Sequence, residues 1–131
     1  MKGGGAMENF MDLNKKRLLS VWFEGAECET HITLFKITRT KEYYIVIQKF
    51  VPDLEDKFRK RTAFFHRYKV QEGDLVEEFK KAMQEYVNGE TLKFYHIDKS
   101  LTNRAKILYT SNSYLFENLE KIRPFLKIKT A

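Results

Sequence analysis

The stretch His31–Lys69 alternates basic residues with aromatic and β-branched ones at a period of two, and this pattern constrains the fold more than any other feature of the chain. Successive side chains of a strand point to opposite faces of a sheet, so this alternation is typical of strands. Proline cannot donate to a strand ladder, so Pro52 ends the second run. The stretch therefore predicts three consecutive strands, at Thr30–Thr38, Tyr43–Val51 and Thr62–Val70.

An amphipathic helix is expected directly after these strands. Asp74 is a favourable N-cap, and Glu77 three residues later completes a pair that resembles a capping box. Apolar residues then recur at i, i+3 and i+4 spacing, which gives one stripe to pack on a sheet. Because Asn88-Gly89 is a strong stop signal, the helix is expected to end there.

The remaining segments complete an α+β plan. Arg17–Phe23 contains a short apolar run that predicts a first strand, whereas the polar segment Glu8–Lys16 is expected to form a short helix or a loose arm. The elements expected after the helix are strands at Thr91–Ile97 and Arg104–Thr110, a helix at Tyr114–Ile122 and a short strand at Phe125–Lys129. The order is four strands, a helix, two or three further strands and a second helix, which predicts an α+β fold with an antiparallel sheet.

The chain length of 131 residues fits one domain with its own core. Residues 1–7 include three consecutive glycines and are expected to be a leader or a cloning remnant. Residues 8–131 form the predicted domain, in which 17–89 hold the four strands and the helix and 90–131 hold a β-β-α extension. The single Cys28 excludes an internal disulfide and fits a reducing compartment. Because no apolar run of membrane-spanning length occurs, we expect a cytoplasmic protein with no membrane partner.

Positive charge is concentrated on the predicted strands. The chain has a net charge of +6, and residues 31–70 carry ten basic and four acidic side chains. Residues 71–89, which contain the first helix, carry two basic and five acidic ones. A basic sheet face behind an acidic helix is expected of a protein that meets a polyanion, although a solvated basic face without a ligand is the alternative.

Aromatic residues are numerous enough to suggest that some of them lie on a surface. Single-stranded nucleic acid binds to cations that follow its phosphates and to rings on which its bases stack. In the strand Thr62–Val70, the face with Phe65, Arg67 and Lys69 is the more basic one and is the expected ligand side. The other face, with Phe64, Tyr68 and Val70, is expected to lie under the helix. Burial in the core is the alternative for any single phenylalanine.

Several segments together resemble a diverged repeat of the purine-rich-element-binding (PUR) family, including its short bacterial members. The segments that carry this resemblance are Phe23–Ala26, Thr30–Ile37, Glu42–Ile47, Arg61–Phe65 and the helix Asp74–Met83 with its Glu78-Phe79 pair. They cover just over half of the chain, through strand order and aromatic placement. The first strand is more apolar than the basic one of the family, and the second half is shorter.

The resemblance implies a function and a site. Members of the family have a repeat of four strands and a helix, pair two repeats into one module and bind single-stranded DNA or RNA on the curved sheet. Together with the more basic strand face, this places the expected nucleic-acid contacts on the following residues: Lys36, Arg39, Tyr43, Arg61, Phe65, Arg67 and Lys69. A second copy of the chain could supply the missing half, so a homodimer is expected.

Other functions have weaker support in the sequence. A small ribonuclease would need an acid–base pair such as His66 with His96, beside a lysine such as Lys93, but no spacing singles them out. The acidic neighbours of Cys28 would raise its thiol pKa and disfavour a nucleophile, and neither a metal site nor a cofactor is expected. An adaptor or mobile-element inhibitor that binds a protein partner remains the main alternative, with Tyr86, Leu115, Phe116 and Phe125 as candidate contacts. We therefore expect a non-enzymatic, single-stranded nucleic-acid-binding protein.

Overall fold

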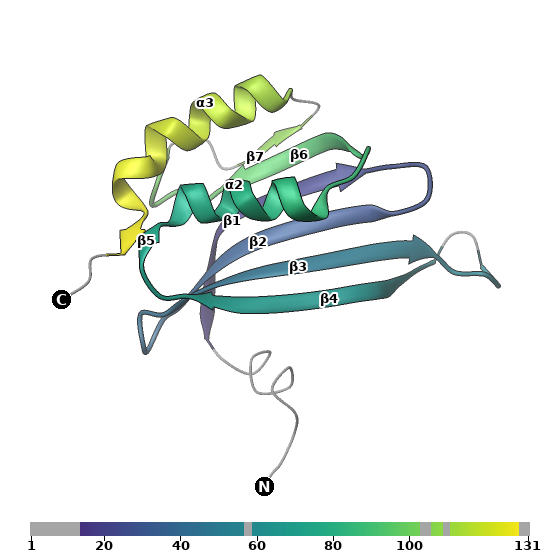
Figure 1. Cartoon of the computed structure of the whole chain (residues 1–131), viewed down its shortest axis with the longest axis horizontal. Coiled ribbons are helices and arrows are strands. Elements are labelled where there is room, and N and C mark those ends of the chain that lie inside the picture. Colours follow the sequence, from purple (N-terminus) through teal and green to yellow (C-terminus); the bar gives the residue numbers. More distant parts are fainter. Residues whose placement is uncertain (1–13, 57–58, 103–105, 109–110, 129–131) are drawn as a thin grey trace, which may run out of the picture.

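A six-stranded antiparallel sheet forms the frame of the protein, and both long helices pack on one of its faces (Figure 1). The computed structural model describes residues 14–56, 59–102, 106–108 and 111–128. The strands of this sheet are β1 (Lys15–Glu24), β2 (Glu29–Ile37), β3 (Tyr43–Pro52), β4 (Lys60–Val70), β6 (Thr91–Ile97) and β7 (Lys106–Leu108). Their order across the sheet is β4-β3-β2-β1-β6-β7.

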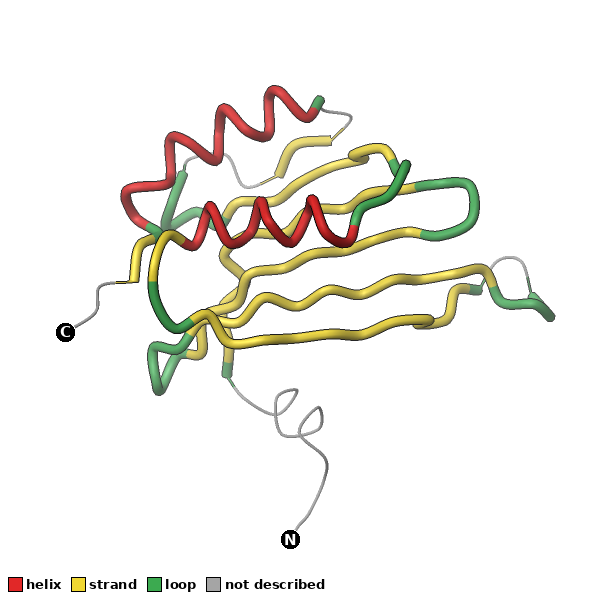
Figure 2. Tube along the Cα trace, viewed as in Figure 1, coloured by secondary structure: helices red, strands yellow, loops and turns green. Residues whose placement is uncertain are grey.

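The first four strands form a meander, in which each strand pairs with the next one along the chain. After β4 the chain passes through helix α2 (Leu75–Tyr86) to the far side of β1, where β6 pairs antiparallel with β1 (Figure 2). β7 then pairs with β6. The segment that follows the first helix therefore widens the same sheet.

The N-terminal ends of both helices are fixed by side-chain caps. Asp74 Oδ1 accepts hydrogen bonds from the backbone N–H of Val76 at 3.0 Å and of Glu77 at 3.3 Å, which confirms Asp74 as the N-cap. Helix α3 (Asn112–Ile122) is capped by Ser111. A 3₁₀ turn, η1 (Arg123–Phe125), leads from α3 to the short strand β8 (Lys127–Ile128), which pairs with β5 (Gly73–Asp74) just before α2. The chain thus returns from α3 to the start of α2.

One apolar core lies between the helices and the sheet. From the helices it receives Phe79, which is fully buried, and Leu119 on α3. From the sheet it receives alternate residues of the central strands, such as Ile32 and Ile47, also fully buried. Burial of a large aliphatic or aromatic side chain contributes about 2 to 3 kcal/mol. The core therefore fixes which face of each strand turns away from the helices.

The expected α+β class, with an antiparallel sheet and two helices, is confirmed. Two local predictions are wrong. Lys15 and Lys16 belong to β1 and not to a helix or a loose arm, because they pair with Ile37 and Lys36 of β2. The short strand predicted at Phe125–Lys129 is present as β8 over Lys127–Ile128, but Phe125 itself lies in η1, since Pro124 favours the helical start of that turn. The predicted strand at Arg104–Thr110 coincides with β7 where the structure describes it, and the leader and the rest of the expected arm lie outside the described residues.

Candidate nucleic-acid interface

The face of the large sheet opposite α2 and α3, called the open face below, presents its residues in rows that cross four strands. From β1 to β4 the rows are Arg17, Phe35, Tyr44 and Lys69; then Ser20, Thr33, Val46 and Arg67; then Trp22, His31, Gln48 and Phe65; then Glu24, Glu29, Phe50 and Thr62. The first two rows contain three basic and no acidic side chains. The last row contains two acidic and no basic ones. The open face therefore has a basic end and an acidic end.

The basic end combines cations with half-buried rings. Arg67 holds its guanidinium carbon 5.9 Å from the centre of the Tyr44 ring, and Lys15 holds its ammonium 5.6 Å from the centre of the Phe35 ring. Arg17 is exposed in the same row as Phe35. A cation over the face of an aromatic ring is attracted by the ring quadrupole, and this attraction holds the cation close to the ring.

The rings at this end rest on a small second cluster of the sheet. Phe35, Tyr44 and Phe65 pack against the buried side chains of Ile37 and Val46. Each of the three rings is only partly buried, so it keeps exposed surface beside the cations. A half-exposed ring held from behind is a suitable platform for a base, because little conformational entropy remains to be lost when the base stacks.

Four of the seven expected contact residues lie at this end. Phe65, Arg67 and Lys69 share the open face of β4, and the register places Phe65 two rows from Lys69. Lys69 pairs with Glu42 Oε2 at 2.5 Å, and this hydrogen bond raises the pKa of the Lys69 ammonium. Arg39 is exposed in the turn between β2 and β3, beside the same end.

The other three expected residues lie elsewhere. Tyr43 pairs with Val70 and packs against the main core, so its ring belongs to the helix-covered face. Lys36 is the cross-strand partner of Tyr43 and holds its ammonium 5.7 Å from that ring, on the same face. Arg61 pairs with Val51, one position beyond Phe50, and therefore projects from the opposite side to the open face.

A β-bulge explains the position of Arg61 and one further error. Lys49 pairs with Phe64, whereas the next residue, Phe50, pairs with Thr62, so Ala63 is an extra residue in β4. One extra residue shifts the alternation by one position. Thr62 therefore lies on the open face with Phe50, although a strict period of two places it with Phe64.

At the acidic end, four rings form a series of contacts beside a buried carboxylate. Trp22 and His31 have ring centroids 3.4 Å apart, and further contacts join His31 to Phe50 at 4.5 Å and Trp22 to Phe94 at 4.8 Å. Glu29 accepts a hydrogen bond from Trp22 Nε1 at 3.1 Å and is also paired with Lys60. The sequence analysis missed this group, because its members come from four strands whose register the sequence does not give.

Burial governs the ionisation of this end. Burial lowers the pKa of His31 to about 4, although the nearby Glu29 carboxylate acts in the other direction. Burial alone would raise the pKa of Glu29, but its hydrogen bonds with Lys60 and Trp22 hold this pKa below its usual value. At neutral pH the pair therefore consists of a neutral imidazole and an ionised carboxylate.

The alternative sites of the sequence analysis are not assembled. His66 pairs with Ile47 on the helix-covered face of β4, whereas His96 pairs with Ser20 on the open face of β6, and three strands separate β4 from β6. Desolvation and the nearby Glu90 raise the pKa of the Cys28 thiol, which disfavours its thiolate. Among the residues that the structure describes, no group of three or more His, Cys, Asp or Glu side chains could hold a metal ion.

The candidate contacts for a protein partner are divided between surface and core. Phe125 and Phe116 have 69% and 40% of their surface exposed, and Tyr86 is half-buried. Leu115 is buried in the main core, so its prediction as an interface residue is wrong.

Comparisons with known proteins give no guide to identity. Of the helices described, none has the length and apolar character needed to cross a membrane. No protein-family model, no curated protein and no solved structure matches this chain.

Proposed function

We propose that this protein binds single-stranded nucleic acid, without catalysing a reaction, on the basic end of its open face. The proposal is carried by one observation: partly exposed rings and cations lie next to one another there on one face of the sheet. Arg67 beside Tyr44 and Lys15 beside Phe35 are the two ring–cation pairs of this arrangement.

The two kinds of side chain have separate roles in the proposal. Arg17, Arg67 and Lys69 neutralise phosphates along the first two rows of the open face. Phe35, Tyr44 and Phe65 provide stacking surfaces, each of which contributes about 1 to 3 kcal/mol per base. Base stacking tolerates many sequences because every base has an aromatic face, so affinity at this end depends mainly on salt and strand length.

The resemblance to the PUR family supports this proposal, since that family binds single-stranded DNA or RNA on a sheet. We extend the proposal to a cytoplasmic homodimer, in which the second copy provides the further repeat that the PUR arrangement requires. Sedimentation or light scattering of the free protein and of its oligonucleotide complex would measure this stoichiometry. A monomer in both samples would contradict the dimer without affecting nucleic-acid binding.

A matched pair of variants of β4 tests the binding face. Arg67→Ala and Arg61→Ala each remove one positive charge from the same strand, but only Arg67 lies on the open face. We expect Arg67→Ala to weaken binding of a single-stranded oligonucleotide and to flatten the log–log salt dependence by about 0.7, the slope for one phosphate on a single strand. Arg61→Ala should leave that slope unchanged.

Fluorescence anisotropy with a labelled oligonucleotide at several salt concentrations measures both quantities. Equal effects of the two substitutions would contradict the proposed face. Absence of binding to any oligonucleotide at low salt would contradict the proposed function. It would favour a protein partner that contacts the exposed Phe125 and Phe116, whose apolar contacts depend much less on salt.

A further inference from the structure

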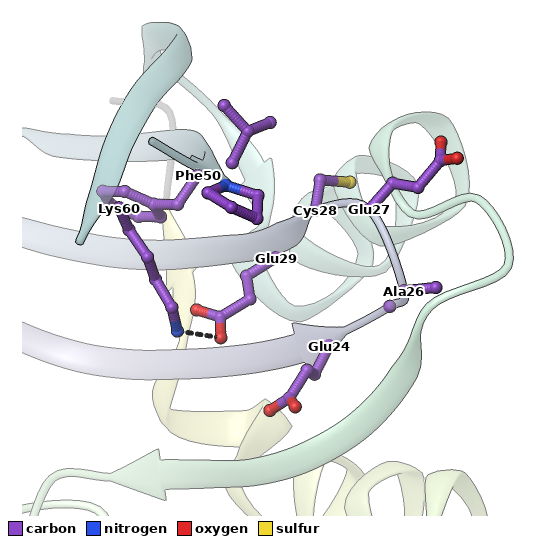
Figure 3. A pocket seen from close by; sticks show the side chains of 10 residues that line it. Glu24, Ala26, Glu27, Cys28, Glu29, Phe50 and Lys60 are labelled. Carbon is purple, nitrogen blue, oxygen red and sulfur yellow. Dashed lines mark hydrogen bonds and ion pairs between the residues drawn. The ribbon is translucent and has the colours of Figure 1, made fainter. Parts of the chain in front are cut away.

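A pocket of about 200 Å³ lies at the acidic end of the open face, between the β1–β2 hairpin and the start of β4. Its lining residues are Glu24, Gly25, Ala26, Glu27, Cys28, Glu29, Phe50, Val51, Pro52 and Lys60. Phe50 and Glu29 belong to the last row of the open face, so the pocket continues the surface that carries the proposed binding site (Figure 3). Its volume is below the range of drug-sized sites and suits one planar ring system.

Glu29 is the central polar group of the pocket. Its side chain is 9% exposed, and its two oxygens are held by Trp22 Nε1 and by Lys60. A carboxylate has about four lone-pair positions, so these contacts leave Glu29 with acceptor capacity. Figure 3 shows Lys60 reaching Glu29 across the pocket. Because the Lys60 side chain is 52% exposed, its ammonium can move aside into solvent when a ligand enters.

The charge of the pocket disfavours a phosphate and favours a hydrogen-bond donor. Glu24, Glu27 and Glu29 line it against the single cation of Lys60. Glu24 and Glu29 are also direct cross-strand partners, and each carboxylate is ion-paired, Glu24 with Lys93 and Glu29 with Lys60. A ring that enters beside Phe50 would be retained if it offered an N–H group to Glu29.

We propose that this pocket receives one base of the bound strand and selects bases with an exocyclic amino group, which donates to the Glu29 carboxylate. The proposal rests on the function proposed above and adds a specificity site to it. The cations of the basic end hold the phosphates, while the base at the other end of the open face turns its Watson–Crick edge to Glu29. In a single strand this edge is free to make such a contact.

Cytosine and uracil separate this effect from stacking, because their rings differ only in the hydrogen-bonding groups at positions 3 and 4. Cytosine presents an amino donor at position 4, and carboxylates accept from it. Uracil presents a carbonyl acceptor at position 4 and has its N–H donor at position 3, so a Glu29 carboxylate aligned with position 4 would face that carbonyl without a hydrogen bond. A carboxylate that accepts a hydrogen bond from cytosine but has none from uracil corresponds to a preference of about tenfold for cytosine.

The test compares oligo-dC with oligo-dU of equal length at one salt concentration, for the wild type and for Glu29→Gln. We expect the wild type to bind oligo-dC about tenfold more tightly, and Glu29→Gln to lose this preference while it keeps its affinity for oligo-dU. Glu85→Gln, an exposed change on α2 that removes the same charge, should retain the preference. Oligonucleotides with N4,N4-dimethylcytosine remove the donor without changing the protein, so they test the same contact even if Glu29→Gln does not fold.

Each outcome has one meaning. Equal wild-type affinity for oligo-dC and oligo-dU, with steep salt dependence for both, overturns the pocket and leaves the proposed function intact. A preference that persists in Glu29→Gln or with the dimethylated base also overturns the role of Glu29. Absence of binding to both oligonucleotides overturns the proposed function, and the pocket with it.

Discussion

The two ends of the open face are built from the same strands but differ in charge and in the exposure of their polar groups. At the basic end, Arg17 and Lys69 are exposed beside partly buried rings. At the acidic end, Glu29 is buried among rings and has its own cation in Lys60. Exposed cations attract a polyanion over distances of about 10 Å, whereas a buried carboxylate acts only on a group in contact with it. The basic end is thus suited to affinity and the acidic end to selection.

Strand geometry explains why both ends occur on one surface. Residues two apart on a strand share a face, so β1 carries Arg17 near its start and Glu24 at its end. The antiparallel partner β2 runs the other way, which places Phe35 beside Arg17 and Glu29 beside Glu24. A bound strand that followed β1 would therefore pass from phosphate contacts to the pocket without leaving the sheet.

The largest expected effect concerns the acidic end and the stability of the fold. The pKa of His31 is lowered by burial to about 4, from an ordinary value near 6.5. Between these pH values the unfolded chain binds a proton at His31 that the folded chain does not. The contribution of His31 to the free energy of unfolding is therefore fully present above pH 6.5 and is lost as the pH falls towards 4. We expect a loss of about 2 kcal/mol between pH 7.5 and pH 5 from this group. Urea unfolding at pH 7.5 and pH 5 measures it.

His31→Phe should remove this part of the pH dependence, because it keeps a ring between Trp22 and Phe50 that cannot take up a proton. His66→Phe is the control, since His66 is exposed on the helix-covered face at the edge strand. If both variants keep the wild-type pH dependence, His31 does not cause the loss of stability in acid. The carboxylates would then account for that loss.

Much of the fold could be predicted from the sequence because local signals agree with the tertiary structure. The period of two from Thr30 to Val70 marks three strands, and Asp74 marks the start of α2. The errors have identifiable causes. Ala63 is an extra residue in the bulged strand β4, which moves Arg61 and Thr62 to the other faces, and no residue type in the sequence marks a bulge. Phe125 follows a proline that continues α3 into a 3₁₀ turn.

The next effect, of about 1 kcal/mol or a five- to tenfold change in affinity, concerns the rings of the basic end. Phe64 and Phe65 are adjacent on β4 but lie on opposite faces: Phe65 packs on the basic-end cluster, whereas Phe64 contacts Tyr86. Phe65→Leu keeps an apolar side chain but removes a stacking surface, so it should weaken oligonucleotide binding by this amount. Phe64→Leu should not, and equal losses in the two variants would show that stacking is not confined to the open face.

The candidate site was only partly predictable, because the sequence does not give the register between strands. Phe65, Arg67 and Lys69 follow from the more basic face of one strand, whereas Tyr44 requires the register between two strands. Choosing the more apolar face of β3 as the buried one, with Ile45 and Ile47, would have placed Tyr44 on the open face. Glu29 had no such signal, because a glutamate among other acidic residues in a loop-to-strand segment resembles any surface residue.

The smallest expected effects come from the turns that close the two ends, and their signs should be opposite. Lys41, in the turn at the basic end, has a φ of 62°, a region that costs a side chain about 1 to 2 kcal/mol. Lys41→Gly relieves this strain but gives the unfolded chain more freedom, which offsets about 0.4 to 1 kcal/mol. We expect a net stabilisation of about 0.5 kcal/mol, measured as a shift of the urea midpoint.

Gly25, in the hairpin at the acidic end, is limited by close packing rather than by its backbone angle. A Cβ atom there would lie 2.9 Å from Glu90 Cγ and 3.3 Å from the Cys28 carbonyl oxygen. Glu90 is held by Thr30 and by the backbone N–H of Asn88 at 2.7 Å, so it cannot easily move. Gly25→Ala should therefore destabilise the protein by about 1 kcal/mol. The opposite result would be a stabilising Gly25→Ala together with a destabilising Lys41→Gly. It would show that the pocket end is the loosely packed end of the sheet. The carboxylates of the pocket would then not be held firmly enough to select a base.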